Sequence, residues 1–174
     1  MRRYILTVLL VIAMIVHILA IMVYLGGTFF MDLLLVPALN RIPPAQAAIV
    51  SQRTGEIFAV TAWIALGLIA ASGLTFLYLS GSLGLDLFLR PYGWLIGAKT
   101  FLFLLLVVNG LIMTIGIRPR LNVLLSLKAT ESELKAKQAD MMSAASTLNR
   151  LIRLNLIIAS VAVILGVTLT FGGF

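Results

Sequence analysis

Four stretches of this chain are long and apolar enough to cross a lipid bilayer, and this pattern restricts the fold more than any other feature. They cover about residues 4–36, 54–79, 91–117 and 150–171, and each provides the roughly 20 apolar residues that a spanning helix needs. Backbone polar groups inside a bilayer must bond within the chain, so we expect helices. The sequence therefore predicts an all-α, integral membrane four-helix antiparallel bundle that forms one transmembrane domain.

The composition agrees with a protein that lives in lipid. Of 174 residues, 61% are hydrophobic and only 11% are charged, whereas about a quarter of the residues in soluble domains are charged. The net charge of +7 comes from basic residues in the loops, so we expect the bilayer and not nucleic acid as the partner. Cysteine is absent, which excludes disulfides and thiol chemistry. No hydrolytic triad or phosphate-binding glycine loop is found, which leaves open whether the protein is an enzyme.

Prolines set the expected ends of the spans. Pro37 is expected to end the first helix at Val36, and Pro91 suits the first turn of the third helix. Pro119 is expected to close the third span.

The distribution of Lys and Arg over the loops predicts the orientation of the bundle. One side has Arg2, Arg3 and Arg90, and the other side has Arg41, Arg53, Arg118, Arg120, Lys128, Lys135, Lys137, Arg150 and Arg153. Loops rich in Lys and Arg stay in the cytoplasm. Both termini are therefore expected outside.

The segment between the third and fourth spans predicts a cytoplasmic helical hairpin over about residues 118–149. Thr130 and Glu133 have the spacing of a capping box. From Leu134 to Gly166, small and apolar residues recur at helical spacing. We expect a single last helix of about 40 residues with a long cytoplasmic extension. This extension is either a stiff stalk or a surface that docks a partner.

The only histidine of the chain, His17, lies within the first apolar stretch. Ionisable side chains inside a membrane usually face a protein interior, a cofactor or an ion path. Ala13, Ala20 and Gly27 recur every seven residues on the side of His17, and small residues mark the side on which another helix can approach. Tyr24 lies on the same side. The pattern predicts that His17 points into the bundle.

Lys99, in the third stretch, is the second ionisable side chain in an unusual place. Spans one and three run in the same direction, so Lys99 and His17 are expected to share the outer half of the membrane. Two interpretations stay open: Lys99 either reaches the outer interface beside Tyr92 and Trp94, or it holds an anionic group inside the bundle.

Two redox groups suit this set of residues. Met14 lies one turn from His17, and a thioether together with an imidazole suits Cu(I). Haem b needs an axial imidazole, which His17 alone can supply. A haem here would require a His–Met pair, a five-coordinate iron, or His17 from each of two protomers.

Three short motifs resemble a known family. The first motif comprises His17, Tyr24, Gly26 and Gly27, followed by the run that ends at Val36-Pro37-Ala38-Leu39. The second is Tyr92-Gly93-Trp94 with Lys99, and the third comprises residues 149–155 with Gly166. Together they resemble the copper-resistance protein D family. That superfamily includes HemJ-type protoporphyrinogen oxidases, which bind haem b through a histidine in helix one and have a lysine in helix three. By resemblance, His17 is the haem or metal ligand and Lys99 is that lysine. The chain departs from the HemJ-type pattern at Tyr24, where that pattern has Trp, and at Gly97, where it has His.

These observations lead to three hypotheses about function. The first is a small membrane protein that binds haem b or a related redox metal centre through His17, with Lys99 on an anionic edge and Tyr24 packed against the site. The second is a protein of copper transport or tolerance, with His17 and Met14 as metal ligands. The third is a non-catalytic accessory subunit of a larger membrane complex or homo-oligomer. In each case we expect a prokaryotic inner or cell membrane.

Overall fold

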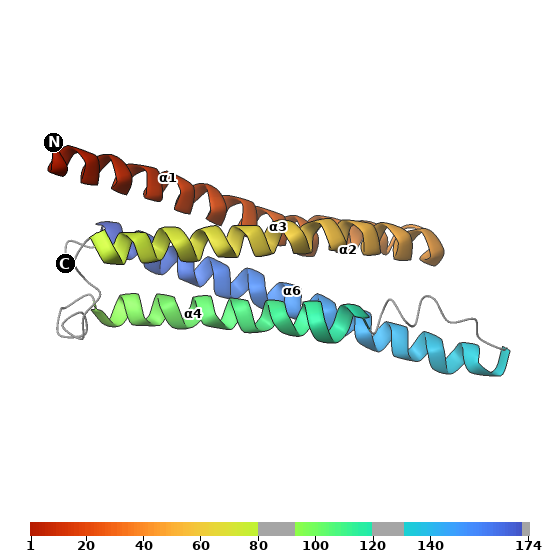
Figure 1. Ribbon diagram of the computed structural model, residues 1–174. Coiled ribbons are helices and arrows are strands. Elements are labelled where there is room, and N and C mark those ends of the chain that lie inside the picture. The colour runs from red at the N-terminus through yellow and green to blue at the C-terminus, as the bar shows by residue number, and fades with distance from the viewer. Residues whose placement is uncertain (80–92, 120–130, 172–174) are drawn as a thin grey trace.

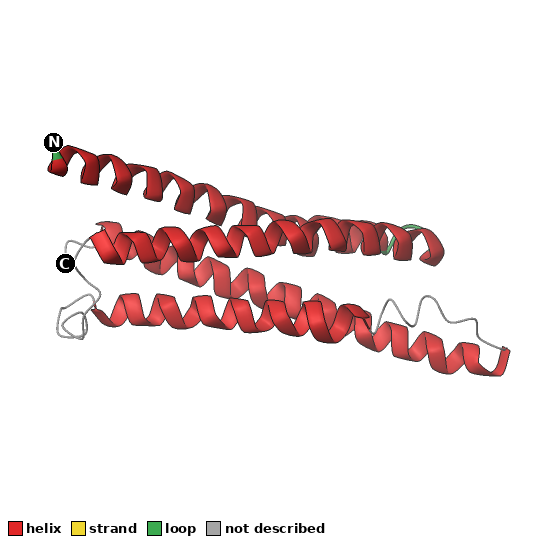
Figure 2. Cartoon of the chain, viewed as in Figure 1, coloured by secondary structure: helices red, strands yellow, loops and turns green. Residues whose placement is uncertain are grey.

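A computed structural model shows a bundle of long helices (Figure 1). It describes residues 1–79, 93–119 and 131–171. These residues are helical except at short connections, and they include no strand (Figure 2). The all-α prediction is therefore confirmed.

The described chain forms four long helical units. The first comprises α1 (Arg2–Phe29), the π-helix η1 (Phe30–Leu35) and α2 (Val36–Leu39). The second is α3 (Pro44–Leu79), and the third comprises α4 (Gly93–Leu111) and the π-helix η3 (Ile112–Ile117). The fourth is α6 (Glu131–Phe171). Each unit contains a stretch long and apolar enough to cross a membrane, which makes this an integral membrane protein.

The first helical unit continues through Pro37, so the prediction that it ends at Val36 is wrong. Proline lacks an N–H and crowds the carbonyl four residues before it. In η1 the pairing has already shifted by one residue, because the N–H of Val36 donates to the carbonyl of Met31. This wider π turn accommodates the proline, and the helix ends at Leu39.

The second unit begins ten residues earlier than the predicted start near residue 54. Pro44 occupies the first helical position, where its missing N–H costs nothing. The carbonyl of Pro43 accepts the N–H groups of Gln46 and Ala47, each at 3.0 Å. The polar residues that follow belong to the same helix.

The fourth unit agrees with the expected single helix, because α6 has 41 residues. It extends beyond the end of α4 (Figure 1). The hairpin expected over residues 118–149 includes residues 120–130, which lie outside the described part of the chain. Pro91 also lies outside it.

Packing between the helices uses two apolar clusters. In the first, Tyr24 contacts small and aliphatic residues of the other three units: Ala65, Leu66, Leu106 and Ala159. In the second, Met31 of η1 packs with Met113 of η3 and Ile152 of α6. Both π-helical segments thus pack in one cluster with α6. All four units converge on Tyr24.

Polar pairs join the helices near the second cluster. Asp32, which is 2% exposed, accepts Nε of Arg153 at 3.3 Å. Nδ2 of Asn109 donates to Oδ1 of Asn155 at 2.7 Å, and the amide of Asn155 donates to the sulfur of Met113 at 3.6 Å. Such bonds between helices substitute for the missing hydrophobic drive inside a membrane.

Candidate functional site

The face of α1 that carries His17 packs against the bundle. Ala13, Ala20, Tyr24 and Thr28 on this side are all less than 9% exposed. His17 itself is half-buried. The small residues let α3 approach, and a Cβ placed on Gly73 of α3 would lie 3.7 Å from Cε1 of His17. The imidazole therefore lies between α1 and α3.

Ser72 of α3 determines which nitrogen of His17 is free. Its Oγ lies 2.8 Å from Nδ1 of His17 and 2.5 Å from the carbonyl oxygen of Leu68, which can only accept. Ser72 has a single hydroxyl hydrogen, and the shorter contact requires it. The tautomer of His17 that fits this geometry has its proton on Nδ1, which donates to Oγ. This assignment leaves Nε2 with a lone pair.

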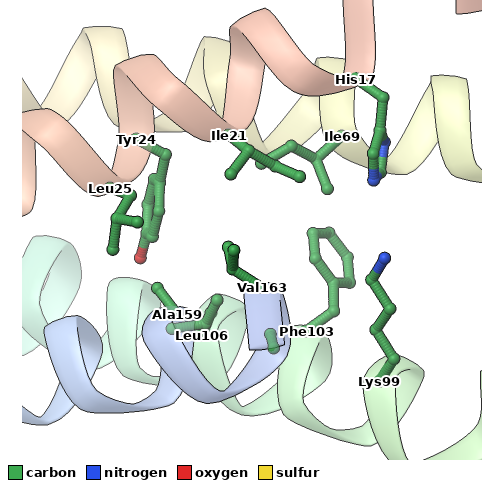
Figure 3. A pocket seen from close by; sticks show the side chains of 11 residues that line it. His17, Ile21, Tyr24, Leu25, Ile69, Lys99, Phe103, Leu106, Ala159 and Val163 are labelled. Atoms are coloured by element: carbon green, nitrogen blue, oxygen red, sulfur yellow. The ribbon is translucent and has the colours of Figure 1, made fainter. Parts of the chain in front are cut away.

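Lys99 of α4 approaches from the opposite side and is half-buried. Its ammonium packs against Gly166 of α6, where an added Cβ would lie 2.9 Å from Nζ. Within residues 1–79, 93–119 and 131–171, no carboxylate forms an ion pair with Lys99. Figure 3 shows the imidazole of His17 and the ammonium of Lys99 pointing toward each other.

The space between these two side chains is a cavity of about 60 Å³. His17, Tyr24 and Lys99 are the polar residues of its wall, but the surface that lines it is almost wholly apolar. The rest of the wall is apolar and comes from all four helical units: Ile21, Leu25, Ile69, Phe103, Leu106, Ala159, Ala162 and Val163. No acidic side chain lines this cavity among the described residues.

In the orientation that the loops predict, this is the outer cavity, and Tyr24 closes its far end (Figure 3). The same side chain also lines a second, inner cavity of about 30 Å³, together with Trp63, Thr114 and Asn155. Nε1 of Trp63 donates to Oγ1 of Thr114 at 3.2 Å. A single tyrosine ring therefore separates two small cavities within the bundle.

Arg118 lines the inner cavity at the end of the third span. Burial lowers the pKa of its guanidinium, and the charge of nearby Glu56 opposes this effect. Gly55 leaves room for the side chain, because an added Cβ there would lie 3.6 Å from one of its terminal nitrogens. Each cavity thus has a basic side chain in its wall, Lys99 in the first and Arg118 in the second.

The structure brings three of the four candidate residues together and leaves the fourth apart. His17, Tyr24 and Lys99 line one cavity. Met14 does not line it, and its side chain is 44% exposed. Among the described residues, no group of three or more His, Cys, Asp or Glu could hold a metal ion. A metal at this site would therefore depend on His17 and on a ligand that comes with it.

The cavity beside His17 has a volume of about 60 Å³ and is partly open, whereas pockets for cofactor-sized ligands measure about 300–1,000 Å³. A haem at His17 would therefore require the helices to move apart at this point. Imidazole nitrogen is a suitable donor for copper.

Sequence reasoning missed two features of the site. Ser72 is one of several hydroxyl residues in the spans, and nothing in its spacing links it to His17, which is 55 residues away. Gly166 lies on the helical stripe of the last span, but its proximity to Lys99 depends on how α4 and α6 pack. Burial of a histidine predicts a polar partner for its ring, but it does not identify Ser72 as that partner.

Comparison with known proteins identifies a family. Residues 52–169 match the family described as copper resistance protein D. This match covers more than half of the 174 residues, and the chain belongs to that family. The matched region includes Ser72, Lys99 and Gly166, whereas His17 and Tyr24 precede it. No curated protein and no solved structure matches the chain.

Proposed function

We propose that this member of the copper resistance protein D family binds copper as its cargo inside the membrane, with Nε2 of His17 as the protein ligand. The observation that carries this proposal is the bond between Nδ1 of His17 and Oγ of Ser72 at 2.8 Å. A metal-binding imidazole typically donates its other N–H to an oxygen in this way.

The surroundings of His17 suit a metal of low coordination number. Few polar groups line the cavity, and its volume of about 60 Å³ admits an ion with one additional ligand. Cu(I) accepts soft or borderline donors and needs few of them. Metals that require an octahedral shell of oxygen ligands would find no such set among the described residues.

The direct test is copper binding by the purified protein in lipid nanodiscs. Under anaerobic conditions, Cu(I) is titrated against a chromophoric chelator, with the wild type, His17→Ala and Met14→Ala compared. We expect the wild type to bind one Cu(I), and His17→Ala to weaken binding by about tenfold or more. Met14→Ala is the matched control, because Met14 lies one turn away but outside the cavity.

Two results would refute the proposal. One is a wild-type protein that binds no Cu(I), and the other is equal affinity in wild type and His17→Ala. In cells, deletion and overexpression should change copper accumulation in opposite directions, and His17→Ala should abolish the effect of overexpression.

Haem b is the alternative that a visible spectrum separates from copper. The proposal expects no Soret band that depends on His17, because copper and not haem iron would occupy the imidazole. A Soret band in the purified protein that His17→Ala removes would instead place haem at this residue.

A further inference from the structure

Two buried methionines occupy equivalent positions in the two π-helices. Met31 is the second residue of η1, and Met113 is the second residue of η3. In each case the N–H of the residue after the π-helix donates to the carbonyl of the methionine, from Val36 to Met31 and from Arg118 to Met113. Both methionine side chains are 6% exposed. Because π turns interrupt the regular pairing of a helix and are frequent at functional sites, this repeated arrangement suggests a common role.

The two methionines pack in one cluster. They lie with Ile152 of α6, and Phe58 of α3 packs against them. Since η1 and η3 belong to different helical units, the cluster brings together thioether groups from two separate spans. Thioethers are soft, uncharged donors, and they are ligands that select Cu(I).

A buried polar network borders the cluster on one side. Nδ2 of Asn155 donates to Sδ of Met113 at 3.6 Å, and Oδ1 of Asn155 accepts Nδ2 of Asn109 at 2.7 Å. The first contact orients the sulfur and engages only one of its two lone pairs. Oδ1 of Asn109 is buried without a hydrogen-bond partner among the described residues. A buried polar atom of this kind is rare, and a bound water or ion often explains it.

The inner cavity reaches the same cluster. Met113, Asn155 and Phe58 line it, and its volume of about 30 Å³ is enough for a group of the size of a water molecule or an ion. Arg118 also lines this cavity. The charge of nearby Glu56 opposes the lowering of the Arg118 pKa by burial, so the positive charge in the wall is partly balanced. A small monovalent cation therefore has a route to Met113.

We propose that Met31 and Met113 form a second copper site, in which both thioether sulfurs bind one Cu(I) ion between η1 and η3. The inference goes beyond the proposed function, because it requires neither His17 nor the outer cavity, and it rests on that function only for the identity of the metal. Two sulfur–copper bonds form, and no proton or electron is transferred. Because imidazole is the stronger donor, we expect this site to fill as a second equivalent, at higher free Cu(I) than the site at His17.

X-ray absorption at the copper edge, measured on the His17→Ala protein, isolates this site. The protein in lipid nanodiscs is loaded anaerobically with excess Cu(I). We expect sulfur neighbours and no imidazole nitrogen, because His17 is the only histidine. Adding Met31→Leu or Met113→Leu should abolish this copper binding, while the similar volume of leucine preserves the packing. Met22→Leu is the matched control, because the Met22 side chain is 63% exposed.

The methyl resonances of methionine provide a second readout in the chain with His17 intact. The protein is labelled with ¹³C at the methionine methyl groups and titrated with Cu(I), and the two leucine variants assign the resonances. We expect the signals of Met31 and Met113 to shift together at the second equivalent, and the signal of Met22 to stay in place. Methionines that only fill space in the bundle would show no such shift.

The outcomes separate the two proposals. Copper with only nitrogen neighbours in the wild type, and methionine signals that do not respond to a second equivalent, overturn this inference and leave copper at His17. Sulfur neighbours that persist in both leucine variants also overturn it. Sulfur-bound copper in a protein whose affinity is equal in wild type and His17→Ala supports this site and overturns the proposed role of His17.

Discussion

In the proposed copper site, Ser72 orients His17 through Nδ1, and the loss of Ser72 should lower the affinity for Cu(I). Ser72→Ala deletes the acceptor for Nδ1, so the ring can rotate and its proton can move to Nε2. We expect Cu(I) affinity to fall about 10- to 100-fold, the usual effect of losing the oxygen behind a histidine ligand. The chelator titration measures it. Ser160→Ala is the control, because Ser160 bonds only to its own helix through the Leu156 carbonyl. Equal affinity of Ser72→Ala and wild type would contradict the assigned tautomer.

Asp32 of η1 and Arg153 of α6 form an ion pair that should contribute to the stability of the bundle. Asp32 is 2% exposed, whereas Arg153 is 67% exposed. Arg153→Ala leaves a buried carboxylate without its partner, and we expect a loss of about 1–3 kcal/mol in stability. Asp32→Asn added to Arg153→Ala should recover part of it. Denaturant unfolding in detergent measures these changes, with Arg150→Ala as the control. Equal effects of Arg150→Ala and Arg153→Ala would rule out this role.

At this scale, the sequence predicts which face of a helix is buried but not its partners. The small residues beside His17 predicted an inward face, and Ala13, Ala20 and Tyr24 are buried. Helical periodicity carries that information within one helix. The contacts of His17 with Ser72, and of Asp32 with Arg153 at a separation of 121 residues, depend on the rotation of one helix against another. The helical period of the sequence does not predict how one helix is rotated against another.

At the scale of the helices, Gly27 lets α1 and α3 approach each other closely. An added Cβ on Gly27 would lie 2.5 Å from the ring of Phe58, which packs with the cluster of Met31 and Met113. Gly27→Ala should cost about 1–3 kcal/mol through overpacking. The thermal midpoint in detergent measures this loss. Gly26→Ala meets nothing within 4 Å and should not destabilise the bundle.

A double variant tests whether the loss of stability in Gly27→Ala comes from contact with Phe58. Phe58→Leu removes the ring atoms that approach Gly27, so Gly27→Ala with Phe58→Leu should be less destabilised than the sum of the single changes. Strict additivity would show that the two residues are not in contact.

The ends of the helices were harder to predict than their existence. The apolar length of each span fixes that a helix forms, but a proline stops a helix only when the chain cannot adjust around it. The shifted pairing in η1 is such an adjustment, and it carries the first unit through Pro37 to Leu39. The start of α3 at Pro44 was missed because polar residues after it resemble a loop. In a helix that emerges from a membrane, those residues face water.

For the whole molecule, the distribution of Arg and Lys predicts that both termini are outside. The chain has no cysteine, so single-cysteine variants report topology without a background. Tyr4→Cys, near the start of α1, should react with a membrane-impermeant maleimide added to intact cells. Ala139→Cys, on α6, should react only after the membrane is opened. Both side chains are exposed. The reverse pattern of labelling would invert the orientation.

The fold class follows from hydropathy because a membrane allows few alternatives to helices. The outer cavity does not follow from it, since residues of all four helical units line it. The proximity of His17 and Lys99 could be expected, because both lie at a similar depth in spans that run in the same direction. The small volume of the cavity could be found only from the packed structure.

One measurement tests the central claim, that Nε2 of His17 is an accessible lone pair which binds copper. His17 is the only histidine, so ¹⁵N-histidine labelling gives the nitrogen resonances of a single imidazole. We predict a protonated Nδ1 and an unprotonated Nε2 before metal is added, and a shift of the Nε2 resonance when Cu(I) is added, with Nδ1 still protonated. A ring protonated at Nε2 whose resonances do not respond to Cu(I) would contradict the account.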